Sequence, residues 1–582
     1  MKKISDIVIE FLIEKNITDA FTISGGGCIH LVDSLRTHSD KLNTYCFHHE
    51  QSIAMAAEGY YRQSNKLCAN IVTTGPGGTN TITGLMGMWT DSIPGLFISG
   101  QVPRSQLSKN TGCRQIGDQE FDIVNLVKPI TKYSTIILDP YDIYYELEKA
   151  YTISMSGRPG PVWIDIPLDI QGAIIDCDKC KRYTEEYIQK SITISDIEQF
   201  LTLLSNAEKP LVITGNGICL SNTSTKLLEF LNKYNLPIVT GPHSGIDCID
   251  NNYKHYMGRI GILGQLTSNQ IVQQSDLLIC LGTRIPVKMT GYNTKEFSPN
   301  SKKIMVDIDH NEIKKHPFDI DLAIVSDLNV FFDSISNDSR KIKTNIEWLS
   351  QINNIRKQQE YYHIKHKNIQ NYASFYYLIH LAKEIWDTET IVTSNGSAHV
   401  ITLQSYRLHT NQKLFTNVGC ASMGYGLPSS IGACIAKNKS KTICIEGDGS
   451  IMMNLQELQT IKHHELPIVI IIINNQGYLS IKLTQESFFK GQEFASGPEN
   501  GVSIPNIKSI ANAFDIKYYS ISDNSEIVDC LTAAKQYNKP CVIEVFTHPK
   551  ERHEPKVTHR GIDKDGKIIP GSLTDMFISE SF

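Results

Sequence analysis

Residues 442–478 read TICIEGDGSIMMNLQELQTIKHHELPIVIIIINNQGY, and this stretch decides the fold. An apolar run at 442–446 ends in the turn Gly-Asp-Gly-Ser, and six aliphatic residues at 468–473 end at two asparagines. Between these runs, apolar residues recur at helical spacing. An unbroken aliphatic run is typical of a parallel strand that is covered on both faces. The stretch therefore predicts a strand, a helix and a second strand of one parallel sheet.

Polar side chains follow both of these strands. Asp448 ends the first strand and Asn475 follows the second, so a right-handed unit brings both to the carboxyl edge of the sheet, where such folds bind ligands. Their oxygens and the carbonyl of Gly477 are the ligands that Mg²⁺ prefers, together with phosphate oxygens. Gly447 and Gly449 would let backbone N–H groups approach a phosphate at the start of a helix. The alternative is a capped turn and a polar loop, but the two motifs together favour a metal-bound diphosphate.

The spacing of the two motifs resembles that of thiamine-diphosphate (ThDP) enzymes. Over most of its length the chain is similar to the acetolactate synthase large subunits, which are also called acetohydroxyacid synthases and belong to the pyruvate decarboxylase superfamily. The resemblance implies ThDP and Mg²⁺ as cofactors. It implies that the following residues contact the diphosphate or the metal: Gly447, Asp448, Gly449, Ser450, Asn475, Gly477 and Tyr478.

Length and composition limit the remaining possibilities. The chain has 582 residues and a net charge of −5, so there is no basic excess for nucleic acid. No segment has the roughly 18 apolar residues that a membrane span needs, and acidic residues interrupt the N-terminal apolar pattern where a signal peptide would be continuous. The 14 cysteines lack paired spacing and suit a reducing compartment. We expect a cytoplasmic protein with no nucleic-acid partner and no membrane partner.

Strands alternate with helical stretches through the whole chain, which predicts α/β architecture with three doubly wound parallel sheets. The predicted domains are 1–171, 191–340 and 373–548, with a charged linker at 341–372 and a tail at 549–582 that is either a lid or a disordered end. The predicted strands are 20–24, 68–73, 95–99 and 162–166; then 210–214, 237–240, 277–281 and 303–308; then 390–394, 442–446, 468–473 and 541–546.

The first domain carries the candidate acid–base residue. Glu50 begins a helical stretch, where a carboxylate could simply favour the helix N-terminus. The resemblance implies instead that Glu50 meets N1′ of the aminopyrimidine and promotes loss of the proton at C2, a role that needs a buried carboxyl. By the same resemblance Gly75 lies beside the thiazolium. Gly26, Gln101 and Gln119 are candidate residues near the substrate, with ordinary loop hydrogen bonding as the alternative for the glutamines.

The middle domain resembles the part of acetolactate synthases that holds FAD. The candidate flavin residues are Gly215, Gly217, Arg284, Lys288 and Asp307. Lys288 stands where the family commonly has arginine, and the two are not equivalent in bidentate contacts. Two possibilities stay open, namely bound FAD and a domain that keeps the fold without the flavin.

Three candidates in the third domain also follow from the resemblance. Gly396 and Ser397 follow a strand and would hold the diphosphate, although the family often has Gln-His after this glycine. Met423 matches the apolar residue that supports the bent cofactor, and the alternative is a core methionine.

The resemblance implies decarboxylation of a 2-oxo acid, most simply pyruvate, and transfer of the two-carbon unit to a carbonyl acceptor. It also implies a homodimer or homotetramer in which Glu50 of one subunit faces Asp448 of another subunit. Residues 477–489 lack the tryptophan that typically shapes the acceptor pocket in this family. We therefore expect a larger acceptor, with a keto-sugar nucleotide as the leading candidate. The alternatives are a genuine acetolactate synthase, a flavin-dependent pyruvate oxidase and a non-catalytic assembly partner.

Overall fold

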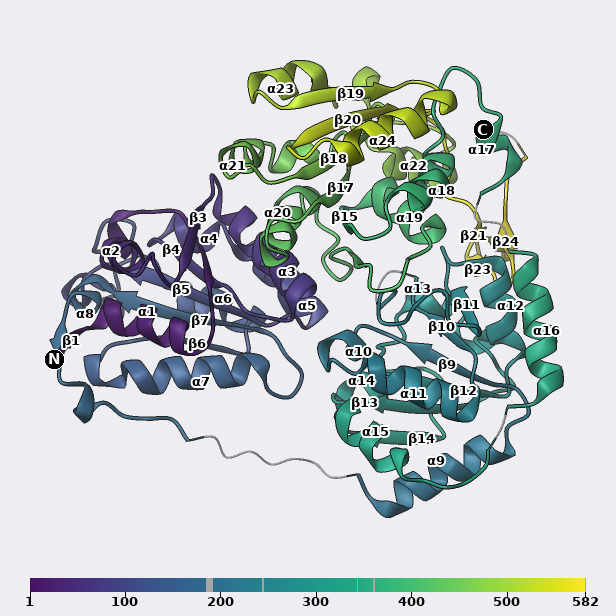
Figure 1. Cartoon of the computed structure of the whole chain (residues 1–582), viewed down its shortest axis with the longest axis horizontal. Coiled ribbons are helices and arrows are strands. Elements are labelled where there is room, and N and C mark those ends of the chain that lie inside the picture. Colours follow the sequence, from purple (N-terminus) through teal and green to yellow (C-terminus); the bar gives the residue numbers. More distant parts are fainter. Residues whose placement is uncertain (185–191, 243–244, 343, 360–361, 581–582) are drawn as a thin grey trace.

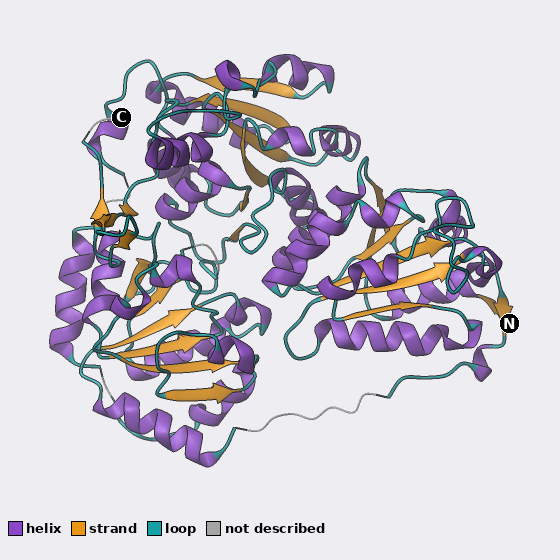
Figure 2. Cartoon of the chain, turned by 180° about the vertical axis from the view of Figure 1, so that it is seen from behind, coloured by secondary structure: helices purple, strands orange, loops and turns teal. Residues whose placement is uncertain are grey.

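The computed structural model describes residues 1–184, 192–242, 245–342, 344–359 and 362–580, and the chain forms three α/β domains (Figure 1). Each domain contains a six-stranded sheet whose strands are all parallel, with helices on both faces (Figure 2). Three doubly wound sheets are what the sequence predicts. The predicted start of the middle domain, residue 191, lies outside the described residues.

The first sheet has the strand order β3-β2-β4-β5-β7-β6. Its central strands are fully buried because helices cover both faces. The elements are β1 (Lys2–Lys3), α1 (Ile4–Glu14), β2 (Asp19–Thr22), α2 (Ile29–Thr37), β3 (Asn43–Cys46), α3 (Glu50–Ser64), β4 (Ala69–Val72), α4 (Pro76–Thr79), α5 (Ile82–Asp91), β5 (Gly95–Gln101), α6 (Ile123–Val127), β6 (Tyr133–Ile136), α7 (Ile143–Met155), β7 (Pro161–Pro167), α8 (Leu168–Gln171) and β8 (Ile174–Ile175).

The middle sheet has the order β11-β10-β9-β12-β13-β14. Its elements are α9 (Ile194–Asn206), β9 (Pro210–Thr214), α10 (Gly217–Leu220), α11 (Ser224–Tyr234), β10 (Ile238–Thr240), β11 (Tyr256–Arg259), α12 (Leu266–Gln274), β12 (Leu277–Leu281), α13 (Val287–Thr290), β13 (Lys302–Asp307), α14 (His310–Lys314), β14 (Leu322–Val325), α15 (Leu328–Ser336) and α16 (Ile346–Lys357). Helix α16 falls in the predicted linker, yet it packs on this domain because Trp348 is buried there and donates to the carbonyl of Pro210 at 3.1 Å.

The third sheet has the order β16-β15-β17-β18-β20-β19, with Gly447 of β17 opposite Ile473 of β18. Its elements are α17 (Ile364–Lys367), α18 (Phe375–Ile385), β15 (Thr390–Thr393), α19 (Gly396–Ser405), β16 (Leu414–Phe415), α20 (Gly426–Ala436), β17 (Thr442–Gly447), α21 (Glu457–His463), β18 (Ile468–Asn474), α22 (Leu479–Phe489), α23 (Ile507–Ala513), β19 (Lys517–Ile521), α24 (Ile527–Gln536) and β20 (Cys541–Phe546). This register brings Asp448 and Asn475 to one edge of the sheet.

Helix α3 of the first domain packs directly on α20 of the third (Figure 1). The two backbones touch: a Cβ added to Gly59 would lie 2.1 Å from the carbonyl oxygen of Ser429, and one added to Gly432 would lie 1.8 Å from that of Ala56. Glycine is therefore required at this crossing because any side chain would push the helices apart. The contact fixes the N-terminus of α3 against the third domain.

The tail, which the structure describes to residue 580, bridges the middle and third domains. It contains β21 (Lys556–Val557), β22 (His559–Ile562), β23 (Ile568–Pro570) and β24 (Met576–Phe577). The amide of Val557 donates to the carbonyl of Ile262 at 2.9 Å, and Gln404 donates to the carbonyl of Pro555 at 2.9 Å. The described part of the tail therefore packs on both domains, and its role as a lid stays a prediction. Within the described part of the chain, no helix is long and apolar enough to cross a membrane.

Candidate functional site

Asp448 follows β17 and is 1% exposed. Its carboxylate accepts three backbone hydrogen bonds, from Gly449 at 2.7 Å, Asn475 at 3.1 Å and Gly477 at 3.0 Å. Burial raises the pKa of Asp448 to about 6, against the opposing effect of these N–H groups. The loop after β18 is thus wrapped around a buried anionic side chain. A cation beside it would offset the cost of burying this charge.

Asn475 supplies the second oxygen of the predicted metal site. It is 4% exposed, and its side-chain Oδ1 is buried with no hydrogen-bond partner among the described residues. A buried oxygen left without a partner is costly unless something else binds it. The carbonyl of Gly477 accepts one hydrogen bond, from Leu479 at 3.1 Å, and keeps a second lone pair. A carboxylate, a free amide oxygen and a carbonyl fit the hard oxygen ligands of Mg²⁺.

The surroundings of Asp448 fit a diphosphate. A Cβ on Gly449 would lie 2.3 Å from the ring of Tyr478, so the loop backbone passes directly under this ring. The hydroxyl of Ser450 contacts the hydroxyl of Ser394 at 2.7 Å and accepts from the amide of Gly424 at 2.9 Å. Helices α19 and α22 both begin next to this loop, at Gly396 and Leu479, and helix N-termini favour anions.

Ser397, in the first turn of α19, contacts a residue that the sequence does not indicate. Its hydroxyl lies 2.8 Å from Nε2 of His553 in the tail. Desolvation lowers the pKa of His553 to about 4, so its imidazole is neutral near pH 7. The two residues are 156 positions apart. No motif joins them, so only the folded tail reveals the contact.

Met423 lies between β16 and α20, in a segment without regular secondary structure. The next residue, Gly424, is held from both sides, since its amide donates to Ser450 at 2.9 Å and its carbonyl accepts from Asn454 at 2.8 Å. The side chain of Met423 is half-buried rather than enclosed in the core. This exposure leaves it free to contact a ligand.

Glu50 is the first residue of α3 and accepts a hydrogen bond from Asn80 at 2.9 Å. It is only half-buried in the single chain, whereas its predicted role needs burial. The neighbouring Gln51 and Ser52 both donate to Asn454 of the same chain, at 3.3 and 3.2 Å. Glu50 therefore sits beside the third domain of its own chain, whereas the resemblance implies two different subunits. The subunit origin of the two halves stays a prediction.

The remaining candidates of the first domain differ in accessibility. Gln101 is 2% exposed, and its side chain donates to Phe121 and Asp165 and accepts from Val102. Both of its N–H donors are therefore used within the first domain, and neither is free for a substrate. Gln119 is exposed with a left-handed backbone, and a Cβ on Gly75 would lie 2.5 Å from its carbonyl oxygen. Gly26 is exposed at the start of a short 3₁₀ turn.

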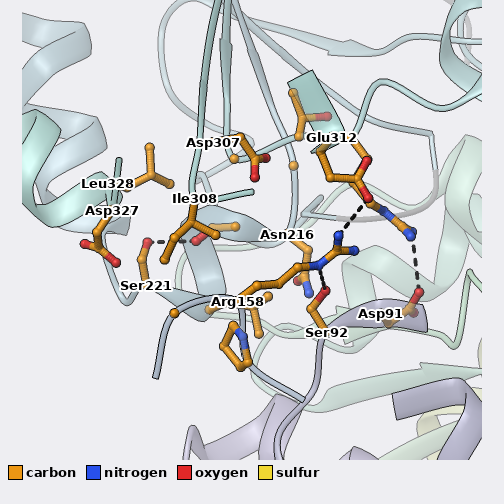
Figure 3. Close-up of a pocket in the computed structure, with 18 of the residues that line it drawn as sticks. Asp91, Ser92, Arg158, Asn216, Ser221, Asp307, Ile308, Glu312, Asp327 and Leu328 are labelled. Carbon is orange, nitrogen blue, oxygen red and sulfur yellow. Dashed lines mark hydrogen bonds and ion pairs between the residues drawn. The ribbon is translucent and has the colours of Figure 1, made fainter. Parts of the chain in front are cut away.

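A cavity of about 290 Å³ lies between the first and middle domains (Figure 3). All five candidate flavin residues line it, namely Gly215, Gly217, Arg284, Lys288 and Asp307. Arg158 borders it and binds Asp309, Glu312 and Ser92, each at 2.8 Å. Desolvation lowers the pKa of Lys288 and raises the pKa of Asp307 to about 6. The cationic side chains of this lining suit phosphates and its carboxylates suit ribose hydroxyls, so the lining fits a nucleotide.

The comparisons with known proteins agree with this geometry. Residues 2–126, 197–335 and 394–545 match the N-terminal TPP binding domain, the central domain and the C-terminal TPP binding domain of the thiamine pyrophosphate enzymes. The chain is 31% identical over 569 residues to a probable acetolactate synthase large subunit of Methanococcus aeolicus, covering 94% of this chain and 92% of that protein. It is 29% identical over 554 residues to the acetolactate synthase isozyme 2 large subunit of Escherichia coli K12, covering 94% and 96%.

Proposed function

The chain belongs to the thiamine pyrophosphate enzyme family, and we propose that it decarboxylates pyruvate and joins the two-carbon unit to a carbonyl acceptor. Its cofactors are ThDP and Mg²⁺. The observation that carries the proposal is the pair formed by the buried Asp448 carboxylate and the Oδ1 of Asn475, which has no hydrogen-bond partner in the part of the chain that the structure describes. ThDP supplies an electron sink for the pair of electrons released when CO₂ leaves.

The third domain would hold the charged end of the cofactor. Asp448, Asn475 and Gly477 would bind Mg²⁺, and backbone groups at Gly447, Gly449 and Gly396 would meet the diphosphate. The hydroxyls of Ser397 and Ser450 would donate to the same oxygens, and Tyr478 would pack over the loop. The three backbone hydrogen bonds to Asp448 support this assignment because they fix its carboxylate before any ligand arrives.

The first domain would supply the carboxyl group that exchanges a proton with the aminopyrimidine of ThDP. We assign Glu50 the contact with N1′, with Asn80 fixing one of its carboxylate oxygens. Met423 would support the bent cofactor, and Gly75 would lie beside it. Of the residues proposed near the substrate, Gln119 and Gly26 are accessible, while Gln101 acts indirectly by holding the segment after β5 through Phe121.

The acceptor is proposed to be larger than pyruvate, with a keto-sugar nucleotide as the candidate. Helix α22 occupies the region where the sequence lacks a tryptophan, and of its residues only Leu479 is buried. The relatives named above are acetolactate synthases, which favours two molecules of pyruvate as the alternative. The finer assignments are a homodimer or homotetramer, a cytoplasmic location and FAD in the cavity, where the nucleotide-type lining supports a flavin.

The test is to incubate the purified protein with ThDP, Mg²⁺ and pyruvate, with and without a keto-sugar nucleotide, and to identify the products by mass spectrometry. A branched sugar product and faster release of CO₂ with the sugar nucleotide are expected. Efficient conversion of pyruvate alone to acetolactate, unchanged by the sugar nucleotide, would establish the ordinary synthase instead. Oxygen uptake with pyruvate would identify the flavin-dependent oxidase, and absence of any turnover would favour the assembly partner.

A further inference from the structure

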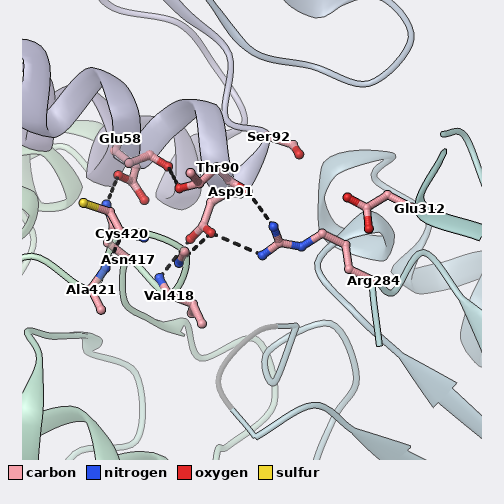
Figure 4. A network of polar contacts seen from close by, with 12 residues as sticks. Glu58, Thr90, Asp91, Ser92, Arg284, Glu312, Asn417, Val418, Cys420 and Ala421 are labelled. Carbon is pink, nitrogen blue, oxygen red and sulfur yellow. Dashed lines mark hydrogen bonds and ion pairs between the residues drawn. The ribbon is translucent and has the colours of Figure 1, made fainter. Parts of the chain in front are cut away.

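Asp91, the last residue of α5, touches all three domains (Figure 4). It is 8% exposed and lines the cavity between the first and middle domains. Its Oδ2 accepts from Arg62 at 2.6 Å and from the amide of Val418 at 3.0 Å. Its Oδ1 accepts from the amide of Gly419 at 2.9 Å and lies 3.6 Å from the guanidinium of Arg284. One buried carboxylate therefore joins the cavity to the third domain.

The third-domain residues that Asp91 holds belong to the segment 416–425, which carries Met423. This segment lies between β16 and α20 and has no regular secondary structure of its own. Within it, the side-chain oxygen of Asn417 accepts from the amides of Cys420 and Ala421 at 3.0 and 3.2 Å. The other end of the segment is fixed by Gly424, whose amide donates to Ser450, two residues after Asp448. The shape of the segment therefore depends on side-chain contacts rather than on a helix or a sheet.

The Asn417 end of the segment is anchored by a second contact with the first domain. Glu58 of α3 is fully buried and accepts from the side-chain amide of Asn417 at 3.0 Å. Arg62 lies between the two carboxylates, at 2.7 Å from Glu58 and 2.6 Å from Asp91. Ion pairs buried in this way are geometrically demanding, and removing one partner leaves the others uncompensated. Asp91 and the segment 416–425 must therefore move together.

Arg284 connects this network to the cavity. It donates to the carbonyl of Thr90 at 2.8 Å, and its side chain is 36% exposed. Its 3.6 Å separation from Asp91 is longer than a hydrogen bond, so the guanidinium can also reach an anion in the cavity. A phosphate bound there would fix Arg284, and with it the Thr90–Asp91 end of α5.

We propose that Asp91 is a positioning residue that couples occupancy of the cavity to the cofactor segment 416–425. A nucleotide in the cavity orders Arg284 and Asp91, and Asp91 then holds the amides of Val418 and Gly419 in the arrangement that places Met423 under ThDP. The two ligands therefore bind with positive cooperativity. By thermodynamic linkage, ThDP–Mg²⁺ strengthens nucleotide binding by the same factor. This inference rests on the proposed cofactor site and on a nucleotide in the cavity.

The test measures the affinity for ThDP in excess Mg²⁺ by titration calorimetry, with and without saturating FAD as the probe. The wild-type protein should bind ThDP at least about fivefold more tightly with FAD, the lower end of typical coupling. In Asp91→Asn the ratio should fall to one, because the amide cannot accept from Arg62 and from both backbone amides at once. A wild-type ratio of one, or an unchanged ratio in Asp91→Asn, would overturn the proposal.

Two further variants separate coupling from folding and from nucleotide affinity. Arg284→Gln leaves the buried Glu58–Arg62–Asp91 contacts in place, so it should fold normally and still reduce the ratio to one at saturating FAD. Arg158→Gln is the matched control, because Arg158 borders the same cavity but hydrogen-bonds to Ser92, Asp309 and Glu312 rather than to Asp91. It should bind FAD more weakly and keep the wild-type ratio. Loss of the ratio in Arg158→Gln as well would assign the effect to the cavity as a whole and reject the route through Asp91.

Failure of this inference can be told apart from failure of the proposed function. If FAD does not bind, the titration is repeated with ADP, and a ratio of one with ADP also rejects the coupling. The product assay with pyruvate stands independently of either titration. An active enzyme with a ratio of one would keep the proposed function and remove the role of Asp91.

Discussion

The cofactor loop consists of the residues around Asp448 and Asn475, and it is built in the opposite way from the interdomain cavity. Most of the cofactor loop comes from one stretch, residues 442–478, where a strand, a helix and a second strand bring Asp448 and Asn475 together. The cavity is lined mostly by residues of the first and middle domains, and Val418 of the third domain also borders it. A site within one supersecondary unit forms as soon as that unit folds. A site between domains depends on how the domains dock, and it can respond to a ligand elsewhere.

The largest expected effect is at the local site. Asp448→Ala removes the one charged group of the proposed metal site and three backbone hydrogen bonds, so ThDP–Mg²⁺ binding should fall by about 100-fold or more, since even outer-shell changes cost 10–100-fold. Calorimetry measures this loss. The matched control is Asn474→Ala, because Asn474 donates to Glu544 and accepts from the amide of Gln476 in the same loop, but does not bind Asp448. Equal losses in the two variants would indicate general disruption of the loop, and unchanged affinity in Asp448→Ala would reject the metal assignment.

The next effect concerns proton exchange on ThDP and not the affinity for the cofactor. Glu50→Gln keeps the size of the side chain but cannot exchange a proton with N1′. C2–H exchange of bound ThDP, followed by NMR after acid quench, should slow by about 10²–10⁴-fold, the usual contribution of general acid–base groups. Gln51→Ala serves as the control because it removes only the neighbouring contact with Asn454. Wild-type exchange in Glu50→Gln would return Glu50 to the role of a helix N-terminal residue.

The same contrast explains what the sequence could predict. The predicted strands are the four central strands of each six-stranded sheet, and the strands missed in these three sheets are the edge strands β3, β6, β11, β14, β16 and β19. A central strand is covered on both faces and reads as an apolar run, as β18 does. An edge strand needs no such run: β6 has no buried residue, and β3 buries only Tyr45. Edge strands therefore leave a weaker signal.

The site residues follow the same rule. The Asp448 and Asn475 pair is readable because it lies within one strand–helix–strand unit. The contact between Ser397 and His553 and the three-domain contacts of Asp91 are not readable, because no spacing in the sequence reports which loops dock together. Gln101 illustrates the converse, since its position in a family-like segment suggested substrate contact, and the sequence could not show that its side chain would be buried with hydrogen bonds to Phe121, Asp165 and Val102. Its contact with substrate stays a prediction.

A smaller effect would test how far the local site depends on the tail. His553→Ala removes one hydrogen bond to Ser397, typically worth about 0.5–1.5 kcal/mol, so ThDP affinity should fall by about two- to tenfold. His553→Gln, which can still donate to the hydroxyl, should restore part of it. Arg560→Ala is the control in the same tail, because Arg560 binds Glu296 and Asp575 away from Ser397. Identical losses in His553→Ala and Arg560→Ala would show that only general ordering of the tail matters.

The last expected effect concerns the cavity and appears as a pH dependence of stability. Burial raises the pKa of Asp307 to about 6, above the usual value near 3.8. The folded protein therefore keeps this proton to higher pH than the unfolded chain does. The folded protein loses stability as pH rises from about 4 to about 6, and this loss reaches its full size above about pH 6. At about 1.4 kcal/mol per pKa unit, the cost reaches at most about 3 kcal/mol.

Asp307→Asn should remove this loss of stability, because asparagine has no proton to lose. Its side-chain oxygen can still accept from the amide of Asp309, which lies 2.9 Å from Oδ1 of Asp307 in the wild type. Its melting temperature should exceed that of the wild type at pH 8, and the difference should disappear near pH 4. Asp309→Asn should behave in the opposite sense. Although burial raises the pKa of Asp309, its hydrogen bonds with Arg158 and backbone amides hold that pKa below the usual value, so the ionised carboxylate stabilises the fold above its usual pKa. A difference in melting temperature between Asp307→Asn and wild type that does not change with pH would show that Asp307 is not desolvated in the cavity, and would weaken the case for a preformed nucleotide site there.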